Sequence, residues 1–533
     1  MRRDGDAVWS TAFTPFIKGG EGRFQRLLNV YAHRLSFRNT TILDLQMHRN
    51  ARQKNGRCTV IKYSLRAAQL TAFFFVMLSG WLMPTAATLA KTGGGKSDTV
   101  ASAYPSSWPM YGFNAAHDAA HRSEGGSGQP ASWKFAVPNA IPLDTTVDAV
   151  KKEYVSITAV RDLVGIPVGV SIVDGIVYVP GDDGYLYALD AADGKLLWKF
   201  DAHNQIMTTP VVAATAHDKM VYVGGGNSDF TYSEAVKFAD PDAHVVRGTG
   251  ISGIYALDAK SGKLVWAYHT RGEDMPTPAF YNGKVVFGNG DGHIYGLDAA
   301  TGKELWKIDI GSFVSMSSAT VSGDLVIMAG THPDNLYAVD ADTGTLAWKT
   351  PLAAYSSSVG DCAPAAADGI VVTQIEAVGT KPGKVASKEV AVDAKTGKIL
   401  WTTTLGMGAV PPRNKDAVPM IHDGVVYTGS PVTKTAYALN LKDGRILWSR
   451  HLARMKAAPA VDSGQVFFPL GNGTIAVLDK ASGKVANLYK SGNGGFGPQN
   501  PVIINGTMYI GTNFGWVNAI PIADVVAKKI TQP

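Results

Sequence analysis

One copy of a repeated unit occupies residues 277–306, with the sequence TPAFYNGKVVFGNGDGHIYGLDAATGKELW. Three β-rich runs, 278–281, 284–288 and 293–298, are separated by Asn-Gly and Asp-Gly pairs, and a fourth run follows Thr-Gly-Lys. These pairs supply the positive φ angles that two-residue hairpin turns need. The unit is therefore predicted to be a four-stranded antiparallel meander.

The second half of this unit recurs along the chain, and most copies end 40 to 53 residues after the previous one. A spacing of about 40–50 residues per four-stranded unit is typical of a propeller blade. A degenerate copy, IAVLDKASGKVAN (475–487), carries Asn487 where the others have Trp. The copies that end in Trp are YALDAADGKLLW (187–198), IYALDAKSGKLVW (254–266), IYGLDAATGKELW (294–306), LYAVDADTGTLAW (336–348), EVAVDAKTGKILW (389–401) and AYALNLKDGRILW (436–448).

The number of blades follows from the opening strands of the copies. These strands begin near eight positions: Pro167, Pro210, Pro278, Ser318, Pro364, Pro419, Pro459 and Pro501. The last copy stops before any Gly-Lys-x-x-Trp strand, while an unpaired Trp strand, SWKFAVP around Trp133, lies near the start. We predict an all-β, eight-bladed β-propeller of four-stranded antiparallel blades. It is closed by this N-terminal strand, which removes two exposed sheet edges.

The N-terminal region has the features of an export signal. Residues 67–83, AAQLTAFFFVMLSGWLM, follow Lys62 and Arg66 and precede small residues up to Ala90. We expect an over-extended start at 1–59, a signal peptide at 60–90 and a flexible leader at 91–104. The propeller is expected at 105–523 and a polar tail at 524–533. A membrane anchor is the alternative for the apolar run, which is short for one.

Composition excludes some classes of function. The formal net charge is +6, but Arg residues near the N-terminus contribute much of it. No basic run is interleaved with aromatic residues, so nucleic-acid binding is not expected. Cys58 lies upstream of the cleavage zone, so the exported chain keeps Cys362 alone and forms no internal disulfide. We predict a periplasmic protein, or one associated with the outer membrane or cell surface.

Chemistry is expected at one mouth of the central channel, where the loops leading into the innermost strands meet. We name these segments the mouth loops. The Asp and Trp of the repeat are expected to cap turns and anchor blades. No D-x-D-x-D-G spacing occurs, so no metal site is predicted. The mouth loops lie at 203–209, 271–277, 311–317, 355–364, 406–418, 453–459 and 491–501.

Asp361 is the candidate catalytic residue among these loops. It lies in an uncharged, Ser-rich loop beside Cys362, immediately before an innermost strand. A carboxyl group in such a low-dielectric setting is expected to have a raised pKa and to transfer protons, although a loop Asp bonded to its own backbone is the alternative. Cys362 is expected to be a buried small residue, because no neighbouring cation lowers its pKa.

Five basic residues on the mouth loops indicate an anionic ligand, although Glu273 and Asp274 offset part of their charge. They are Arg271, Arg413, Lys415, Arg454 and Lys456. Blade two carries an insertion between Gly226 and Ile254. Such insertions cap a mouth or form an oligomer contact, and a homodimer is compatible with it.

The repeats, together with the opening segment WPMYGFNAAHDAAHR (108–122), resemble the pyrroloquinoline-quinone (PQQ) repeat superfamily. That superfamily includes quinoprotein alcohol dehydrogenases, the outer-membrane assembly scaffold lipoprotein and tetrathionate hydrolases of acidophilic sulfur oxidisers. The chain lacks the vicinal Cys pair of the dehydrogenases and the lipoprotein Cys of the scaffold. Its size, its blade-two insertion and the loop SVGDCAP (358–364) are most similar to tetrathionate hydrolase.

This resemblance implies hydrolysis of tetrathionate to thiosulfate, sulfur and sulfate, without a redox cofactor, outside the cytoplasm of an acidophile. It maps the family's catalytic acid to Asp361. Because tetrathionate is a dianion, we expect the mouth-loop cations Arg413, Lys456 and Arg271 to bind this anionic sulfur substrate. Asp361 could act as general acid or as general base. An outer-membrane assembly scaffold, with association to that membrane, and a PQQ-dependent dehydrogenase are the alternative functions.

Overall fold

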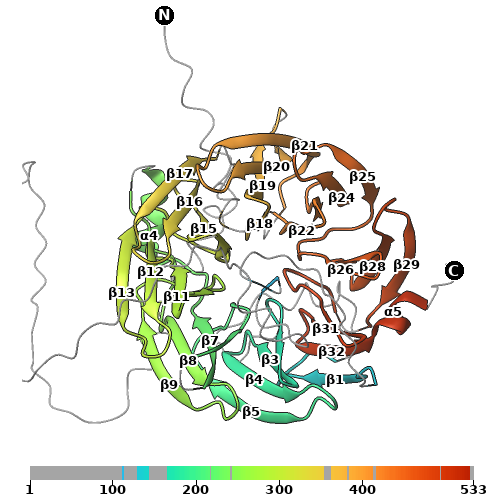
Figure 1. The fold of residues 1–533 in the computed structure, drawn as a ribbon, viewed down its shortest axis with the longest axis horizontal. Helices are drawn as coiled ribbons and strands as arrows, with labels where there is room; N and C mark the ends of the chain where they lie inside the picture. Colours follow the sequence, from blue (N-terminus) through green and yellow to red (C-terminus); the bar gives the residue numbers. More distant parts are fainter. Residues whose placement is uncertain are drawn as a thin grey trace, which may run out of the picture. The chain divides into compact units, whose positions relative to one another are not determined.

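The computed structural model describes residues 111–112, 114, 129–142, 165–215, 218–240, 243–352, 360, 362–380, 383–411, 416–492 and 494–527. Its strands form eight four-stranded antiparallel sheets, which stand around one axis (Figure 1). In the seven sheets from β2 to β29, consecutive strands are neighbours, as expected for a meander. The predicted eight-bladed propeller is confirmed.

Each blade has one strand in each of four positions between the axis and the rim. The innermost strands are β2 (Ser171–Val173), β6 (Val211–Ala214), β10 (Ala279–Tyr281), β14 (Thr320–Ser322), β18 (Ala365–Ala367), β22 (Met420–His422), β26 (Ala460–Asp462) and β30 (Val502–Ile504). The second strands are β3 (Ile176–Pro180), β7 (Lys219–Gly225), β11 (Lys284–Gly288), β15 (Leu325–Gly330), β19 (Ile370–Val378), β23 (Val425–Thr428), β27 (Gln465–Pro469) and β31 (Thr507–Gly511). The third strands are β4 (Tyr185–Asp190), β8 (Gly253–Asp258), β12 (His293–Asp298), β16 (Asn335–Asp340), β20 (Lys384–Asp393), β24 (Thr435–Asn440), β28 (Thr474–Asp479) and β32 (Trp516–Pro521). The outer strands are β5 (Leu196–Asp201), β9 (Leu264–His269), β13 (Glu304–Asp309), β17 (Leu346–Pro351), β21 (Ile399–Ala409), β25 (Ile446–His451), β29 (Val485–Lys490) and β1 (Trp133–Ala136).

The ring is closed by the N-terminal strand, as predicted. Strand β1 pairs antiparallel with β32, and Trp133 lies opposite Ala519 in the register. The eighth blade therefore combines the two ends of the propeller, and the last copy of the repeat needs no fourth strand of its own.

The repeated Gly and Trp join neighbouring blades. The indole N–H of Trp266 donates to the carbonyl of Ala299 in the next blade, at 3.0 Å. Its ring covers Gly302, whose φ is +72° and whose missing Cβ would lie 2.6 Å from a ring atom. Only glycine combines this backbone conformation with this close approach. Six Trp-to-carbonyl bonds of 2.8–3.2 Å follow the pattern: Trp133–Ala191, Trp266–Ala299, Trp306–Ala341, Trp348–Ala394, Trp401–Leu441 and Trp448–Lys480.

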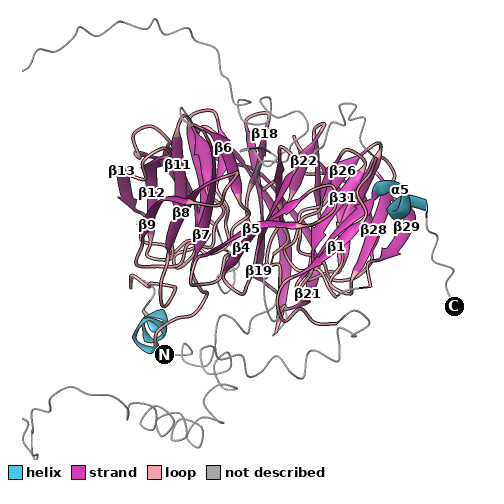
Figure 2. Ribbon diagram, turned by 90° about the horizontal axis from the view of Figure 1, so that it is seen from below, coloured by secondary structure: helices cyan, strands magenta, loops and turns pink. Residues whose placement is uncertain are grey.

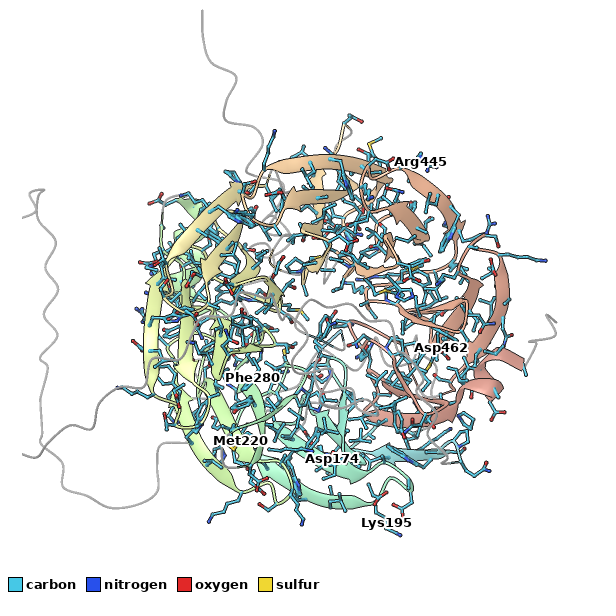
Figure 3. The ribbon with its side chains drawn as sticks, viewed as in Figure 1. Asp174, Lys195, Met220, Phe280, Arg445 and Asp462 are labelled. Carbon is cyan, nitrogen blue, oxygen red and sulfur yellow. The ribbon has the colours of Figure 1, made fainter. Side chains whose placement is uncertain are left out.

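The other repeat residues have the structural roles that were expected. The Asp298 carboxylate accepts bonds from the backbone N–H and the hydroxyl of Thr301, at 2.8 and 2.7 Å, and so caps its turn. The basic residue of the turn lies at the outer rim, as Lys195 and Arg445 show (Figure 3). These repeat residues stabilise the turns and the contacts between blades, so the residues that bind a ligand are expected in the loops.

The seventh blade shows why its Trp is absent. Strand β32 of the eighth blade runs into α5 (Ile522–Ala527) and has no Gly-Lys turn for an indole to cover. In its place, the side-chain amide of Asn487 donates to the carbonyl of Val525 on α5, at 2.6 Å. Val525 is fully buried. The boundary expected at residue 523 thus lies inside a helix, because this helix covers apolar surface of the last blades.

The blade-two insertion lies on the face of the mouth loops. In an antiparallel meander the connection from second to third strand shares a face with the loop that leads into the first strand. The insertion carries the short helix α4 (Tyr232–Val236) and the 3₁₀ turn η3 (Lys237–Ala239). Figure 2 shows α4 protruding from one face of the ring. Within the described part of the chain, no helix has the length and apolar character required to cross a bilayer.

Candidate active site

The mouth loops share one repeat position, which the structure describes in seven of the eight blades. In each blade this position lies four residues before the first residue of the innermost strand. Around the ring it is occupied by Pro167, Met207, Met275, Met316, Asp361, Asp416, Lys456 and Pro498. Charged residues therefore hold this position only in blades five, six and seven. We name the residues at this position in blades five, six and seven, which are Asp361, Asp416 and Lys456, the charged sector.

The structure places two of the four predicted site residues. Lys456 belongs to the charged sector and is 5% exposed, and its carbonyl accepts from the N–H of Val418 at 3.1 Å. Arg271 is exposed on the mouth loop of blade three, on the opposite side of the ring. Asp361 and Arg413 lie outside the described residues, as does Lys415, so their assignment stays a prediction.

A buried glutamine organises the charged sector. Gln374 on β19 donates from its side-chain amide to Glu389 at 2.8 Å, to Thr428 at 3.1 Å and to the carbonyl of Gly429 at 2.7 Å. Its amide oxygen accepts from the N–H of Ala417 at 2.9 Å. Gln374 thus fixes the loop after Asp416 against blades five and six.

Three carboxylates are buried around this glutamine. Glu376 and Glu389 are fully buried, and Asp416 is 2% exposed. Burial raises the pKa of Glu389 to about 7, although hydrogen bonds from Gln374 and Thr428 act in the opposite direction. Glu389 is therefore protonated and uncharged in an acidic medium. The negative charge around Gln374 is then smaller than it would be if all three carboxyl groups were ionised.

Arg454, two residues before Lys456, adds a second basic residue to the mouth loop of blade seven. Burial lowers the pKa of its guanidinium, and the carboxylate of Glu376 opposes this effect. An arginine remains cationic under such a shift because its ordinary pKa is above 12. Arg454 and Lys456 therefore place two cations in a region with little water, where charge interactions with an anion are strong.

Cys362 is a structural residue in this setting, as predicted. It is fully buried, and its thiol lies 3.3 Å from the carbonyl of Ala417 and accepts from the N–H of Gln374 at 3.4 Å. Burial, and then the negative charge of Asp416, raise the pKa of the thiol. The protonated thiol is a poor nucleophile.

The acidic residues expected to offset the cations have other partners. Glu273 is fully buried and pairs with Arg247 of the blade-two insertion at 3.0 Å. Asp274 accepts from Asn289 at 2.8 Å and from the hydroxyl of Thr270, and burial raises its pKa to about 8. Glu273 thus attaches the insertion to the mouth loop of blade three, while Asp274 fixes that loop to Asn289 of the same blade.

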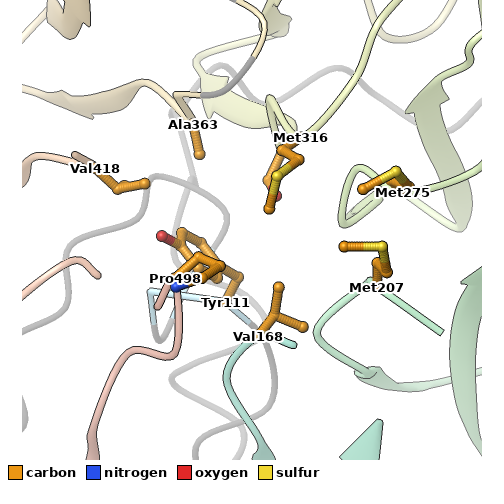
Figure 4. A pocket seen from close by; sticks show the side chains of 9 residues that line it. Tyr111, Val168, Met207, Met275, Met316, Ala363, Val418 and Pro498 are labelled. Atoms are coloured by element: carbon orange, nitrogen blue, oxygen red, sulfur yellow. The ribbon is translucent and has the colours of Figure 1, made fainter. Parts of the chain in front are cut away.

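A small cavity on the axis adjoins the charged sector (Figure 4). The ring of Tyr111, from the segment before the propeller, packs there against Ala363, Val418 and Ala458. Burial raises the pKa of this phenol, so it stays a neutral hydrogen-bond donor. The opposite wall is formed by Met207, Met275 and Met316. The cavity lining is thus mainly apolar, whereas the repeat position in the mouth loops is charged in blades five to seven and apolar in the others.

Sequence reasoning missed the buried polar residues of blade five. The signal was present, because β19 reads IVVTQIEAV where the second strands of other blades carry apolar residues and glycine. Polar residues within an otherwise apolar strand position indicate a buried network. Among the described residues, no group of three or more His, Cys, Asp or Glu side chains is arranged to hold a metal ion.

Comparison with known proteins gives consistent results. The family model described as outer membrane protein assembly factor BamB matches residues 133–237, 233–386 and 334–523. A tetrathionate hydrolase of Acidithiobacillus ferrooxidans is 33% identical over 444 residues, which cover 79% of this chain and 87% of that protein. A tetrathionate hydrolase of Acidianus ambivalens is 31% identical over 473 residues, or 80% of this chain and 86% of that protein.

Among solved structures, a quinohemoprotein alcohol dehydrogenase, ADHIIG from Pseudomonas putida HK5, matches with a TM-score of 0.51 at 16% identity. The match covers 81% of this chain and 82% of the dehydrogenase. At this identity the likeness concerns the fold alone.

Proposed function

Because the chain belongs to the tetrathionate hydrolase family of BamB-like PQQ-repeat propellers, we propose that it hydrolyses tetrathionate. The observation that supports the proposal is that blades five to seven combine two basic residues, Arg454 and Lys456, with the buried carboxyl groups of Glu376, Glu389 and Asp416. A dianion with a weak S–S bond needs cations for its sulfonates and a group that transfers protons.

The proposed reaction balances without an external oxidant. Tetrathionate and one water give thiosulfate, one sulfur atom, sulfate and two protons. The water oxygen enters the sulfate as the S–S bond to one sulfonate breaks, and the electron pair of that bond stays on the departing three-sulfur chain, S3O3²⁻. A second S–S bond then breaks, its electron pair stays on the thiosulfate, and the terminal sulfur leaves as the sulfur atom. Because oxidation and reduction occur among the sulfur atoms of one substrate, no redox cofactor is required.

We assign the protein groups as follows. Asp361 transfers the proton, either from the attacking water or to the departing sulfur. Arg413 and Lys456 hold a sulfonate, and guanidinium suits its oxygens because it donates two parallel bonds. Arg271, exposed across the ring, attracts the dianion from solvent.

We further propose that the protein works in an acidic medium outside the cytoplasm. Three carboxyl groups, the fully buried Asp274 and Glu389 and the half-buried Asp182, have raised pKa values: about 7 for Asp182, about 8 for Asp274 and about 7 for Glu389. All three are neutral at acid pH, so acid removes the cost of holding their charges in the protein interior.

The test is release of thiosulfate from tetrathionate by the purified protein at acid pH, without added quinone. We expect Asp361→Asn to lower kcat at least a hundredfold, which is the usual scale for loss of a proton-transferring group. Lys456→Met should raise KM. The matched control is Asp368→Asn, an exposed turn residue of the same blade, which should leave both constants unchanged.

The competing function is that of an assembly scaffold, which the description of the family model favours. A scaffold would release no thiosulfate and would co-purify with outer-membrane assembly proteins. A folded wild-type protein without hydrolysis would refute the enzymatic proposal.

A further inference from the structure

The apolar wall of the central cavity repeats one side chain in three consecutive blades. Met207, Met275 and Met316 each lie four residues before an innermost strand, at β6, β10 and β14. All three line the same cavity (Figure 4). Met275 is 3% exposed, and the other two are partly exposed. We name these three residues the methionine wall.

The methionine wall faces a cavity with little polar character. Val168, Ala363 and Val418 contribute aliphatic groups to it, and Tyr111 contributes its ring. The free space is about 20 Å³, which is enough for a single water-sized atom. None of the described residues that line it is charged, and the hydroxyl groups belong to Ser318 and Tyr111. An uncharged atom is favoured in such surroundings, because an ion would lose its hydration without gaining a charged partner.

The cavity directly borders the charged sector. Ala363 follows Cys362, and the N–H of Val418 donates to the carbonyl of Lys456 at 3.1 Å. Val418 also lies two residues after Asp416. A ligand that spans both regions has a charged end and an uncharged, apolar part next to it.

Resting on the proposed function, we propose that the methionine wall binds the uncharged sulfur atoms between the two sulfonates of a polythionate. These divalent sulfurs are polarizable and weakly hydrated, as thioether sulfur is. Oxygen-rich dianions such as sulfate have no such part. The site thus selects dianions whose charged ends are joined by a sulfur chain, and the cavity accommodates one sulfur atom of that chain.

The test compares tetrathionate with 1,2-ethanedisulfonate, in which two methylenes replace the two central sulfurs. Both are titrated calorimetrically into the wild type and into Met207→Leu/Met275→Leu/Met316→Leu. Leucine keeps apolar volume and removes sulfur, and such exchanges are well tolerated in cores. Met455→Leu is the matched control, since Met455 is 1% exposed and packs beside Gly429, away from the cavity lining.

We expect the triple variant to bind tetrathionate about tenfold more weakly while its affinity for ethanedisulfonate changes less than twofold. Met455→Leu should change neither affinity. Equal losses for both ligands, or no loss for tetrathionate, would overturn the inference. Absence of turnover in a wild type that still prefers tetrathionate would refute the proposed hydrolysis and leave the sulfur subsite standing. A thermal midpoint within a few degrees of wild type shows that the variant is folded.

Discussion

Glu389→Gln should change how the stability of the propeller depends on pH. Glu389 is fully buried on β20, and one carboxyl oxygen accepts from Gln374 at 2.8 Å. Among the residues that the structure describes, none donates a hydrogen bond to the other carboxyl oxygen of Glu389, Oε2. Glutamine has the shape of the protonated acid and keeps the bond from Gln374, but it cannot ionise.

The size of the effect follows from the raised pKa. The pKa rises from 4.5 to about 7 on folding. One pH unit corresponds to about 1.4 kcal/mol, so the contribution is about 3 kcal/mol. It is fully present below the pKa of the unfolded chain, where both states are protonated. It is lost as pH rises from about 4.5 through 7, because the unfolded chain ionises first.

The variant and the wild type should therefore have similar stability at pH 4 and differ at pH 8. At pH 8 we expect the variant to be more stable by about 3 kcal/mol, since it never places a charge beside Gln374. Asp182 and Asp274, with pKa values of about 7 and 8, give both proteins a decline over the same range. The difference between the two proteins isolates Glu389.

Urea unfolding followed by tryptophan fluorescence, at one-unit steps from pH 4 to pH 8, measures this difference. The control is Asp342→Asn, an exposed carboxylate that pairs with Lys284 at 2.7 Å. Its curve should stay parallel to that of the wild type. A constant difference between Glu389→Gln and wild type across the range would refute the assignment of a buried, neutral acid.

Two further predictions concern the joints of the ring. Gly302→Ala should lower the free energy of unfolding by about 2 kcal/mol, since its φ is +72° and a Cβ would meet the Trp266 ring. The control is Gly323→Ala, where φ is +62° and the space around a Cβ is open. In the same urea titration this variant should lower the free energy of unfolding by only about 1 kcal/mol. Asn487→Ala should remove the 2.6 Å bond to Val525 and cost about 1 kcal/mol. Hydrogen exchange should then rise in 522–527 and stay unchanged at strand β1; equal protection of the helix in both proteins would contradict its anchoring by Asn487.

The architecture could be predicted from the sequence because the blade motif occurs several times along the chain. Six copies have both the turn glycine and the Trp of the outer strand, so strand order and blade number follow from counting. Closure by Trp133 could be predicted because one strand was missing at one end and one was left over at the other. Asn487 was visible as an exception, but its reason was not, since α5 belongs to the last blade and packs against the seventh.

The site was less predictable because it depends on residues that belong to no shared pattern. Lys456 was found from its charge, and the structure places it in the charged sector. Gln374 and Glu389 were missed because they lie within strands, where sequence patterns report burial but not which neighbours are polar. Glu273 was expected to weaken the cations, yet it pairs with Arg247 from an insertion whose path the sequence does not reveal.

The division of the mouth into a charged and an apolar side follows from how a propeller uses repetition. Positions inside the repeat are fixed by the joints between blades, so a change there destabilises two sheets at once. The position before each innermost strand lies outside those joints and is free to differ from blade to blade. Three blades carry methionine at this position and three carry a charged residue, so the sequence can vary these groups without changing the joints of the ring. A ligand with uncharged sulfur between two anionic ends is complementary to both groups of residues, whereas a uniformly hydrophilic anion would interact with the charged residues alone.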